Sequence, residues 1–318
     1  MATHHNGRRE FMASVGMGAA ALALPGRMAA GSASPERKFF FILSLGRIGF
    51  KASFPDAVTL AAKHGFEGLD PDAAYFASLS DDDLKRLLDD LKAKKLKLGA
   101  AGLSVEFRKD EATFNEGLAK LPAIAAVLQR AGVARVSTYI MSAHQELSYL
   151  QNFRQHAARL REIAVILKDQ GLKFGLEYVG PRTTWRSQRH PFLHTLSETR
   201  ELIVAIGTGN VGMQLDTYHW FNAEETSADI QTLRGEDVIT VDLNDAPAGL
   251  TLDQQQDLSR ELPGATGVIP IQAFLKSLRK ISYDGAVHAE PFSAALRSKP
   301  LDEACALTAA AMKKVLGL

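Results

Sequence analysis

Eight short apolar runs alternate with amphipathic, helix-like segments from residue 38 onward, and this alternation limits the folds open to the chain more than any other feature. Strands that are separated by helices pair in parallel, and strands as apolar as these must be covered on both faces. Eight such units over about 280 residues are typical of an α/β fold with a closed (β/α)8 barrel, the TIM barrel. The expected strands are residues 39–45, 66–70, 96–104, 134–140, 173–179, 211–217, 238–243 and 285–292.

The segments between the expected strands carry the usual signals of helix ends. Pro55 and Pro270 stand where the first turn of a helix tolerates proline, and Gly65 and Gly171 stand where a helix end favours glycine. An open, doubly wound sheet is the competing arrangement. The first expected strand is followed by SLGRIGF instead of the G-x-G-x-x-G turn of a dinucleotide-binding sheet, and the sequence has no P-loop. These observations disfavour a nucleotide-binding protein.

The first 33 residues have a different character. Arg8 and Arg9 precede a short run of small, apolar residues, which is typical of an export signal and too short to span a bilayer. The paired arginines resemble the twin-arginine signal, although Gly7 stands where that signal usually has serine or threonine. We expect residues 1–33 to be a twin-arginine-type signal peptide and linker, residues 38–318 to form the barrel domain, and the protein to be exported to the periplasm. A retained membrane anchor and a disordered tail are the alternatives.

Charge and cysteine content exclude several classes of protein. The 37 basic and 36 acidic residues are spread along the chain, so we expect no nucleic-acid partner and no stable membrane insertion after signal removal. The single cysteine, Cys305, rules out an intramolecular disulfide and falls in an expected helix, where packing is its usual role. The lack of disulfides is compatible with folding in the cytoplasm before export.

Four consecutive expected strands end in acidic residues. The carboxyl ends of all strands of a (β/α)8 barrel open into one shared mouth, so these four carboxylates are expected at the same level. Like charges packed together are costly unless a cation neutralises them or some of them are protonated. The set therefore predicts a metal site, and its oxygen ligands favour Mn²⁺ or Mg²⁺, while Co²⁺ or Zn²⁺ are also compatible. The predicted ligands are Glu177, Asp216, Asp242 and Glu290.

A divalent ion with open positions could hold the neighbouring oxygens of a hydroxy-ketone and polarise its carbonyl. Glutamates on both sides of the ion could then move protons at the adjacent carbon. That chemistry passes through an enediolate and leads to isomerisation, epimerisation or β-elimination.

Several motifs of this chain resemble those of a known family. GLEYVG, LDTYHW, NDAP, RELPG and SYDGAVHAEPF follow one another in the order seen in the sugar phosphate isomerase/epimerase group of xylose isomerase-like TIM barrels, and the resemblance covers residues 38–316. It implies that Glu177 and Glu290 are the catalytic acid/base pair and that both bind the metal with Asp216. Asp242 stands where many members of the group have histidine, so it matches in position only.

The resemblance also implies two substrate-binding residues. His219 matches a histidine that contacts substrate or supports the metal, with packing against Trp220 as the alternative. Arg260 matches a substrate-binding arginine, with a solvated loop charge as the alternative. The expected partner is a small carbohydrate, and a homo-oligomer is compatible with the sequence.

The first hypothesis is therefore a metal-dependent isomerase or epimerase, or a related lyase, of a keto-sugar, sugar or inositol-like substrate. We expect an unphosphorylated substrate, because phosphorylated sugars are mainly cytoplasmic. A non-catalytic sugar-binding barrel is the alternative, favoured by the missing histidine at position 242. An endonuclease IV-like nuclease is a remote alternative, because the early strands of this chain lack the metal-binding histidines that such a nuclease needs. If Asp242 does not bind the ion, three ligands remain, and Asn244 or a water must complete the site.

Overall fold

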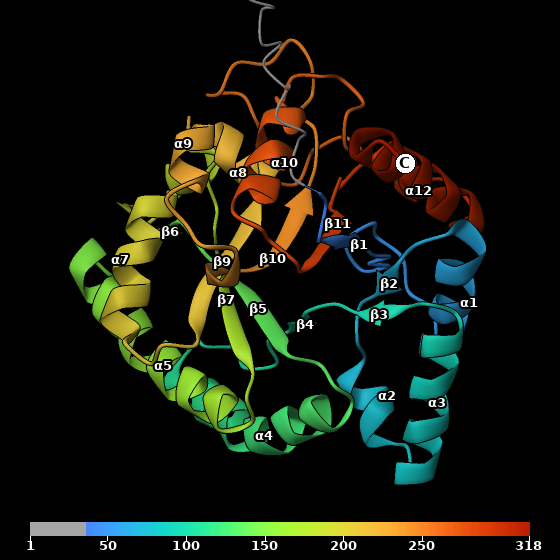
Figure 1. The fold of residues 1–318 in the computed structure, drawn as a ribbon. Coiled ribbons are helices and arrows are strands. Elements are labelled where there is room, and N and C mark those ends of the chain that lie inside the picture. Colours follow the sequence, from blue (N-terminus) through green and yellow to red (C-terminus); the bar gives the residue numbers. More distant parts are fainter. Residues whose placement is uncertain (1–35) are drawn as a thin grey trace, which may run out of the picture. The chain divides into compact units, whose positions relative to one another are not determined.

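The structure is a computed structural model that describes residues 36–318, and the predicted signal segment lies outside the described residues. Its centre is a parallel barrel in which the eight predicted strand regions follow one another around the ring (Figure 1). The ring closes because the last strand pairs in parallel with the first, Phe40 opposite Ala286. The barrel strands are β1 (Phe40–Phe41), β2 (Gly68–Leu69), β3 (Lys97–Leu98), β4 (Ala101–Gly102), β5 (Arg135–Ile140), β7 (Lys173–Tyr178), β9 (Val211–Asp216), β10 (Val238–Leu243) and β11 (Ala286–Ala289).

The first three barrel positions are less regular than the sequence predicts. The expected third strand is divided into β3 and β4, and only two residues of the expected first strand form a ladder. Even so, the backbone after Phe41 bonds to both neighbours: the N–H of Ile42 donates to Val287 on one side, and the N–H of Leu43 donates to Gly68 on the other. A parallel bridge between Leu43 and Leu69 joins β1 to β2. The barrel is therefore closed at this point.

Helices surround the barrel (Figure 1). Several of their starts are capped, with Ser53, Ser80 and Asp110 each accepting a hydrogen bond from a backbone N–H of the first turn. Gly65 ends the first helix in a left-handed conformation with φ 70°, which glycine adopts without strain. The helices are α1 (Phe54–His64), α2 (Ala73–Ala77), α3 (Asp81–Ala93), α4 (Glu111–Arg130), α5 (Tyr149–Asp169), α6 (Arg182–Trp185), α7 (Leu196–Ile206), α8 (Thr217–Asn222), α9 (Ser227–Ile230), the 3-10 turn η1 (Gly235–Asp237), α10 (Ile271–Lys280), α11 (Ala294–Arg297) and α12 (Leu301–Leu316). Cys305 is buried in α12.

Strand β10 shows why these segments are so apolar. All six of its residues are buried, because one face lines the barrel interior and the other is covered by helices. Its register with the neighbouring strands places Asp242 opposite Asp216 on β9 and opposite His288 on β11. Register therefore brings acidic residues from consecutive strands to one level at the carboxyl end of the barrel.

The loop from residue 244 to residue 270 folds over this end. Asp245 holds it, because its carboxylate accepts hydrogen bonds from the backbone N–H groups of Thr266, Gly267 and Ile269. Its backbone pairs with Glu261 in an antiparallel bridge, which places the adjacent Arg260 at the mouth. A two-stranded ribbon of β6 (Ala143–His144) and β8 (His190–Pro191) lies outside the barrel sheet. Among the described helices, none is both long and apolar enough to cross a membrane.

Candidate active site

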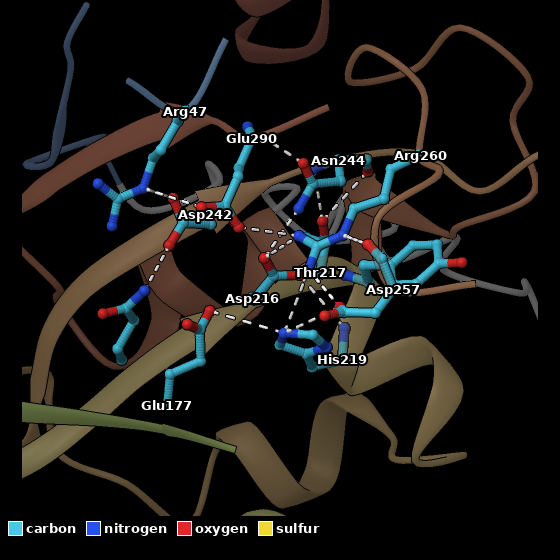
Figure 2. A network of polar contacts seen from close by, with 12 residues as sticks. Arg47, Glu177, Asp216, Thr217, His219, Asp242, Asn244, Asp257, Arg260 and Glu290 are labelled. Carbon is cyan, nitrogen blue, oxygen red and sulfur yellow. Dashed lines mark hydrogen bonds and ion pairs between the residues drawn. The ribbon is translucent and has the colours of Figure 1, made fainter. Parts of the chain in front are cut away.

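The four predicted carboxylates meet at the carboxyl end of the barrel (Figure 2). Glu177 lies in β7, Asp216 ends β9, Asp242 lies in β10 and Glu290 follows β11 directly. Each of the four offers one oxygen atom, and these oxygens all lie within 4.8 Å of one another. The structure thus brings together the residues that the sequence selected.

Asp216 is held by the start of α8 and by the strand beside it. One of its carboxylate oxygens accepts hydrogen bonds from the backbone N–H groups of Tyr218 and His219. The other accepts from the side-chain amide of Asn244 at 2.9 Å, and the amide oxygen of Asn244 accepts from the backbone N–H of Glu290. The side-chain amide of Asn244 therefore links Asp216 to the backbone of Glu290 and sets the spacing between these two residues.

Asp242 is completely buried and is contacted by protein donors at both oxygens. Its Oδ1 lies 2.7 Å from Nε of Arg47 and 2.5 Å from Nδ1 of His288, and its Oδ2 accepts from Gln214 at 2.7 Å. Nε2 of His288 lies 3.1 Å from the hydroxyl of Thr240. The arrangement is satisfied when His288 donates from Nδ1 and accepts at Nε2. His288 thus lies one layer deeper in the barrel, where strand alternation places it.

Arg260 is the buried cation on the other side of the mouth. Its guanidinium donates to Asp216 at 2.8 Å, to Glu290 at 2.9 Å and to Asp257 at 2.7 Å. The ring of Phe292 lies against the guanidinium, 4.7 Å from it. This arginine is not a solvated loop charge, because its side chain is only 1 % exposed.

Glu177 and His219 face each other at the base of the mouth. Nε2 of His219 lies 3.9 Å from Oε1 of Glu177 and 3.8 Å from Oδ1 of Asp257. Oε1 of Glu177 and Nδ1 of His219 are buried, and neither has a hydrogen-bond partner within residues 36–318. The backbone at residue 180 passes close to the backbone of His219, which requires glycine at this position. A Cβ atom at Gly180 would lie 2.4 Å from the carbonyl oxygen of His219.

The acidic residues differ in how strongly they hold protons. Burial, followed by the charges of the other three carboxylates, raises the pKa of Glu177 well above its ordinary value. Burial and the charge of Asp242 raise the pKa of Glu290 to about 8. Burial opposes ionisation of Asp242 too, but the charge of Arg47 and the hydrogen bonds from His288 and Arg47 outweigh it and lower the pKa of Asp242. Glu177 and Glu290 therefore release a proton less readily than an ordinary carboxyl group, and Asp242 releases one more readily.

His219 is held neutral. Burial lowers the pKa of its imidazole below the ordinary value, and this outweighs the opposing effect of Asp216. A neutral imidazole can accept as well as donate a hydrogen bond.

A cavity of about 590 Å³ opens onto these groups, a size in the usual range for small-molecule sites. Its charged and polar lining residues are Glu177, Glu290, Asp257, Arg260, His219 and Gln256. Phe292 also lines the cavity and has a φ of 40°, a conformation that residues other than glycine rarely adopt. Apolar and hydroxyl-bearing residues complete the lining: Tyr139, Met141, Val179, Thr183, Thr184, Ser187 and Leu258.

The side chains at the mouth suit a divalent cation. Within residues 36–318, the four carboxylates of the group and Asp257 lie around the guanidiniums of Arg47 and Arg260, so the acidic groups outnumber these cations. Glu177 adds a buried oxygen with no partner among residues 36–318. A second group that could hold an ion combines Glu177 and Asp216 with His219. All these donors are oxygen or imidazole nitrogen, which suit Mg²⁺, Mn²⁺ or Zn²⁺.

Three contributors to the site were missed from the sequence. Arg47 follows β1 and reaches Asp242, Gln214 precedes Asp216 by two residues, and Asp257 precedes Arg260 by three residues in the same loop. A usable signal existed for Arg47, because a charged residue just after a barrel strand points to the mouth. Among the aromatic residues of this region, Phe292 lines the cavity, whereas Trp220 is buried against Phe274.

Comparison with known proteins agrees with this architecture. Residues 58–314, well over half of the chain, match the model of a family described as the xylose isomerase-like TIM barrel. The chain belongs to this family. The xylose isomerase-like TIM barrel is thus confirmed as the fold, as the alternating strands and the motifs predicted.

The curated relatives within this family carry the name of one enzyme. An inosose isomerase of Halalkalibacterium halodurans is 24 % identical over 222 residues, which cover 69 % of this chain and 73 % of the relative. Further relatives from Bacillus species have the same name. These matches place the chain among sugar isomerases and epimerases without naming its substrate.

Two solved structures of xylose isomerase-like barrels are similar to this one. A xylose isomerase domain protein from Alicyclobacillus acidocaldarius is 27 % identical, with a TM-score of 0.77 over 88 % of this chain and 98 % of that chain. The IolI protein, solved with a bound zinc atom, is 20 % identical, with a TM-score of 0.72 over 88 % of this chain and 98 % of that chain.

Proposed function

We propose that this protein is a divalent-metal-dependent isomerase or epimerase of an unphosphorylated keto-sugar, sugar or inositol-like compound. The observation that carries the proposal is the pair Glu177 and Glu290, two glutamates that line one cavity and whose pKa values burial raises above that of an ordinary carboxyl group. A carboxyl group whose pKa is raised toward the working pH can both take up and release a proton. This supports proton transfer at a carbon beside a carbonyl.

Glu177, Asp216 and Glu290, with Asp242 beside them, offer the oxygens that would hold the ion. When bound, a divalent ion would supply Lewis acidity that polarises the substrate carbonyl. One glutamate, as carboxylate, removes the proton from the adjacent carbon, and the other, as carboxylic acid, delivers a proton to the carbon that becomes protonated. The same pair performs an isomerisation or an epimerisation, depending on which carbon receives the proton.

The remaining cavity residues position the substrate. His219 Nε2 and the guanidinium of Arg260 lie 3.3 Å apart, so a hydroxyl group of a sugar could bond to both. The ring of Phe292 offers an apolar face to the C–H face of a sugar ring. These contacts fix which carbon faces Glu177 and which faces Glu290.

The cavity supports an unphosphorylated substrate. Among the described residues that line it, Arg260 is the one that carries a positive charge, and three carboxylates already accept hydrogen bonds from its guanidinium. A phosphate group would compete with those carboxylates for the same donors. Neutral hydroxyl groups meet no such competition.

The test is proton exchange in D₂O with Mn²⁺ and a panel of inososes and keto-sugars. We expect one substrate carbon to gain solvent deuterium, and we expect Glu177→Gln and Glu290→Gln each to lower the rate by about 10²- to 10⁴-fold, as is usual when a general acid or base is lost. Glu261→Gln, a change of the same kind beside Arg260 but outside the carboxylate group, should keep the rate. Sugar binding without any exchange would favour the non-catalytic binding protein, and turnover of sugar phosphates alone would contradict the substrate class.

We also propose that residues 1–33 direct export of the folded protein to the periplasm. The proposal rests on Arg8 and Arg9 and the small, apolar run that follows them. Replacement of both arginines by lysine keeps the charge and should leave the protein in the cytoplasm, as measured by cell fractionation. Unchanged export of that variant would rule out a twin-arginine signal.

A further inference from the structure

We propose that the substrate is a sugar or sugar-like compound that carries an apolar substituent, as an aryl glycoside does, and that the cavity binds this substituent together with the sugar. The inference deepens the proposed function and rests on it for the sugar part of the substrate. Three observations carry it: the size of the cavity, the number of apolar side chains in its lining, and the exposure of two of them.

The cavity is larger than a single sugar ring needs. Its volume is about 590 Å³. A hexose has about twelve non-hydrogen atoms, and if each took the roughly 30 Å³ of a water molecule in the liquid, the sugar would fill about 360 Å³. This value is an upper bound, because covalently bonded atoms lie closer together than water molecules do. Space therefore remains in the cavity for another part of the substrate.

The lining of the cavity is more apolar than a sugar alone explains. Phe292 offers the one aromatic face that stacking on a sugar ring requires. Four further apolar or aromatic side chains line the same cavity, and they come from the carboxyl ends of β5 and β7 and from the loop of residues 244–270: Tyr139, Met141, Val179 and Leu258. The hydroxyl groups of a sugar gain little from such side chains. An apolar substituent removes them from water, which stabilises the complex in proportion to the apolar area buried.

Two of these side chains are exposed to an extent that is unusual for large apolar residues. Leu258 is 71 % exposed and Tyr139 is 43 % exposed, whereas Glu177 and Arg260, which line the same cavity, are buried. The two exposed residues therefore border the side of the cavity that is open to solvent. A single exposed leucine is common, but exposed apolar side chains that share a cavity with a polar site are typical of ligand binding. A ligand that is polar at one end and apolar at the other matches this arrangement.

Both exposed residues stand on backbone that is held in place. The ring centre of Tyr139 lies 4.2 Å from the guanidinium carbon of Arg108, which also donates a hydrogen bond to the carbonyl oxygen of Tyr139 at 2.8 Å. Leu258 follows Asp257, whose carboxylate accepts a hydrogen bond from Arg260 at 2.7 Å. A ligand that contacts these residues therefore loses less free energy to ordering of the protein than one that contacts a mobile loop.

Two pairs of glycosides test the inference by binding alone. Phenyl and methyl β-D-glucopyranoside share the sugar and differ in the apolar substituent, and the corresponding β-D-galactopyranosides repeat the comparison with another arrangement of hydroxyl groups. Isothermal titration of the protein in the presence of MnCl₂ gives the affinities. In at least one pair we expect the phenyl glycoside to bind about tenfold more tightly or better, because burial of two groups the size of CH₂ gives roughly this factor. Equal affinities in both pairs, or no measurable binding of any of the four, would overturn the inference.

Two leucines of one loop show whether the cavity lining causes the preference. Leu258→Ser removes an apolar side chain from the lining. Leu250→Ser is the matched control, because Leu250 lies in the same loop and is 43 % exposed but is not among the described residues that line the cavity. Both leucines are exposed, so we expect both variants to fold.

We expect Leu258→Ser to lower the preference for phenyl over methyl by about threefold, roughly the contribution of one buried CH₂ group, and to leave the affinity for the methyl glycoside unchanged. Leu250→Ser should keep the preference of the wild type. The same preference in both variants would overturn the assignment of the substituent to this cavity.

These titrations need no turnover, so their outcome is separate from that of the proposed reaction. Deuterium uptake into a keto-sugar, combined with no preference for phenyl glycosides, would overturn the inference and leave the proposed function in place. A preference for phenyl glycosides without any deuterium uptake would support the inference and favour the non-catalytic binding protein.

Discussion

Arg260 shows how much a single side chain does in this mouth. Its planar guanidinium reaches three carboxylates from different parts of the chain, on β9, after β11 and in its own loop, while its exposure is only 1 %. A lysine carries the same charge but is a point donor without the planar fork, so it cannot take up all of these contacts at once. The shape of the cation matters here as much as its charge.

We therefore predict that Arg260→Lys destabilises the protein by about 1–3 kcal/mol, because at least one buried carboxylate oxygen loses its donor. Urea unfolding measures the loss. Arg186→Lys is the matched control: Arg186 pairs with Asp253 at the surface, where its side chain is 53 % exposed, and surface pairs contribute ~0–1 kcal/mol. Equal, small losses of unfolding free energy in both variants would show that the planar guanidinium of Arg260 is not needed for stability.

The carboxylates at the strand ends could be predicted from the sequence, and Arg260 from the family resemblance, whereas the contact of Arg47 with Asp242 could not. Glu177, Asp216 and Glu290 each follow an apolar run, so one pattern identifies all three. Arg47 is 195 positions away from Asp242 along the chain, and its contact depends on closure of the barrel between the first and last strands. Sequence periodicity carries no information about which loop side chain crosses the mouth.

At the scale of elements, one hydroxyl group ties the ends of two strands together. Thr217 stands where β9 passes into α8, and its side chain is completely buried. Its Oγ1 accepts a hydrogen bond from the backbone N–H of Asn244 at 2.7 Å and lies 3.1 Å from the carbonyl oxygen of the same residue. The end of β10 is thereby fixed to the end of β9.

We predict that Thr217→Val costs about 1–3 kcal/mol of stability, because the buried N–H of Asn244 loses its acceptor. Asn244 also donates a hydrogen bond to Asp216, so the variant should bind Mn²⁺ more weakly when the metal-free protein is titrated with MnCl₂. Thr217→Ser keeps the hydroxyl group and should restore both properties to near the wild-type level. A valine variant as stable as the serine variant would contradict the role of this bond.

The regular elements of the fold could be predicted to different degrees. Strands β5, β7, β9, β10 and β11 lie within the predicted ranges because long β-branched or apolar runs mark them. The third predicted strand contains Gly99 and Gly102, and glycine weakens strands, which agrees with its division into β3 and β4. The ribbon of β6 and β8 is two residues long on each side, too short to show a period.

At the scale of the whole molecule, the uncompensated acidic charge makes stability depend on pH. Glu290 has a pKa of about 8 when folded, against about 4.3 for an unperturbed glutamate. Between these values the folded state holds a proton that the unfolded state has released, so this group contributes stability that is present below pH ~4.3 and is lost as the pH rises through about 8.

We predict that metal-free Glu290→Gln becomes more stable relative to the wild type as the pH rises from 5 to 8, by at most ~1.4 kcal/mol per pH unit. Urea unfolding in EDTA at several pH values measures the difference between the two proteins, in which the contributions of other titrating groups largely cancel. A constant difference between Glu290→Gln and the wild type over this range would mean that the Glu290 carboxyl group ionises normally in the folded protein.

The closure of the barrel by its two ends has a consequence for how the protein is made. Arg47 leaves the ribosome early in synthesis, whereas Glu290 follows the last strand, which pairs with the first. No partial chain lacking β11 can therefore contain the complete mouth, however well its earlier helices have formed. Contacts between residues so far apart in sequence form late and slowly. The divalent ion of the proposed function would meet its finished site only after translation is nearly complete, which would make loading of the ion one of the last steps in maturation.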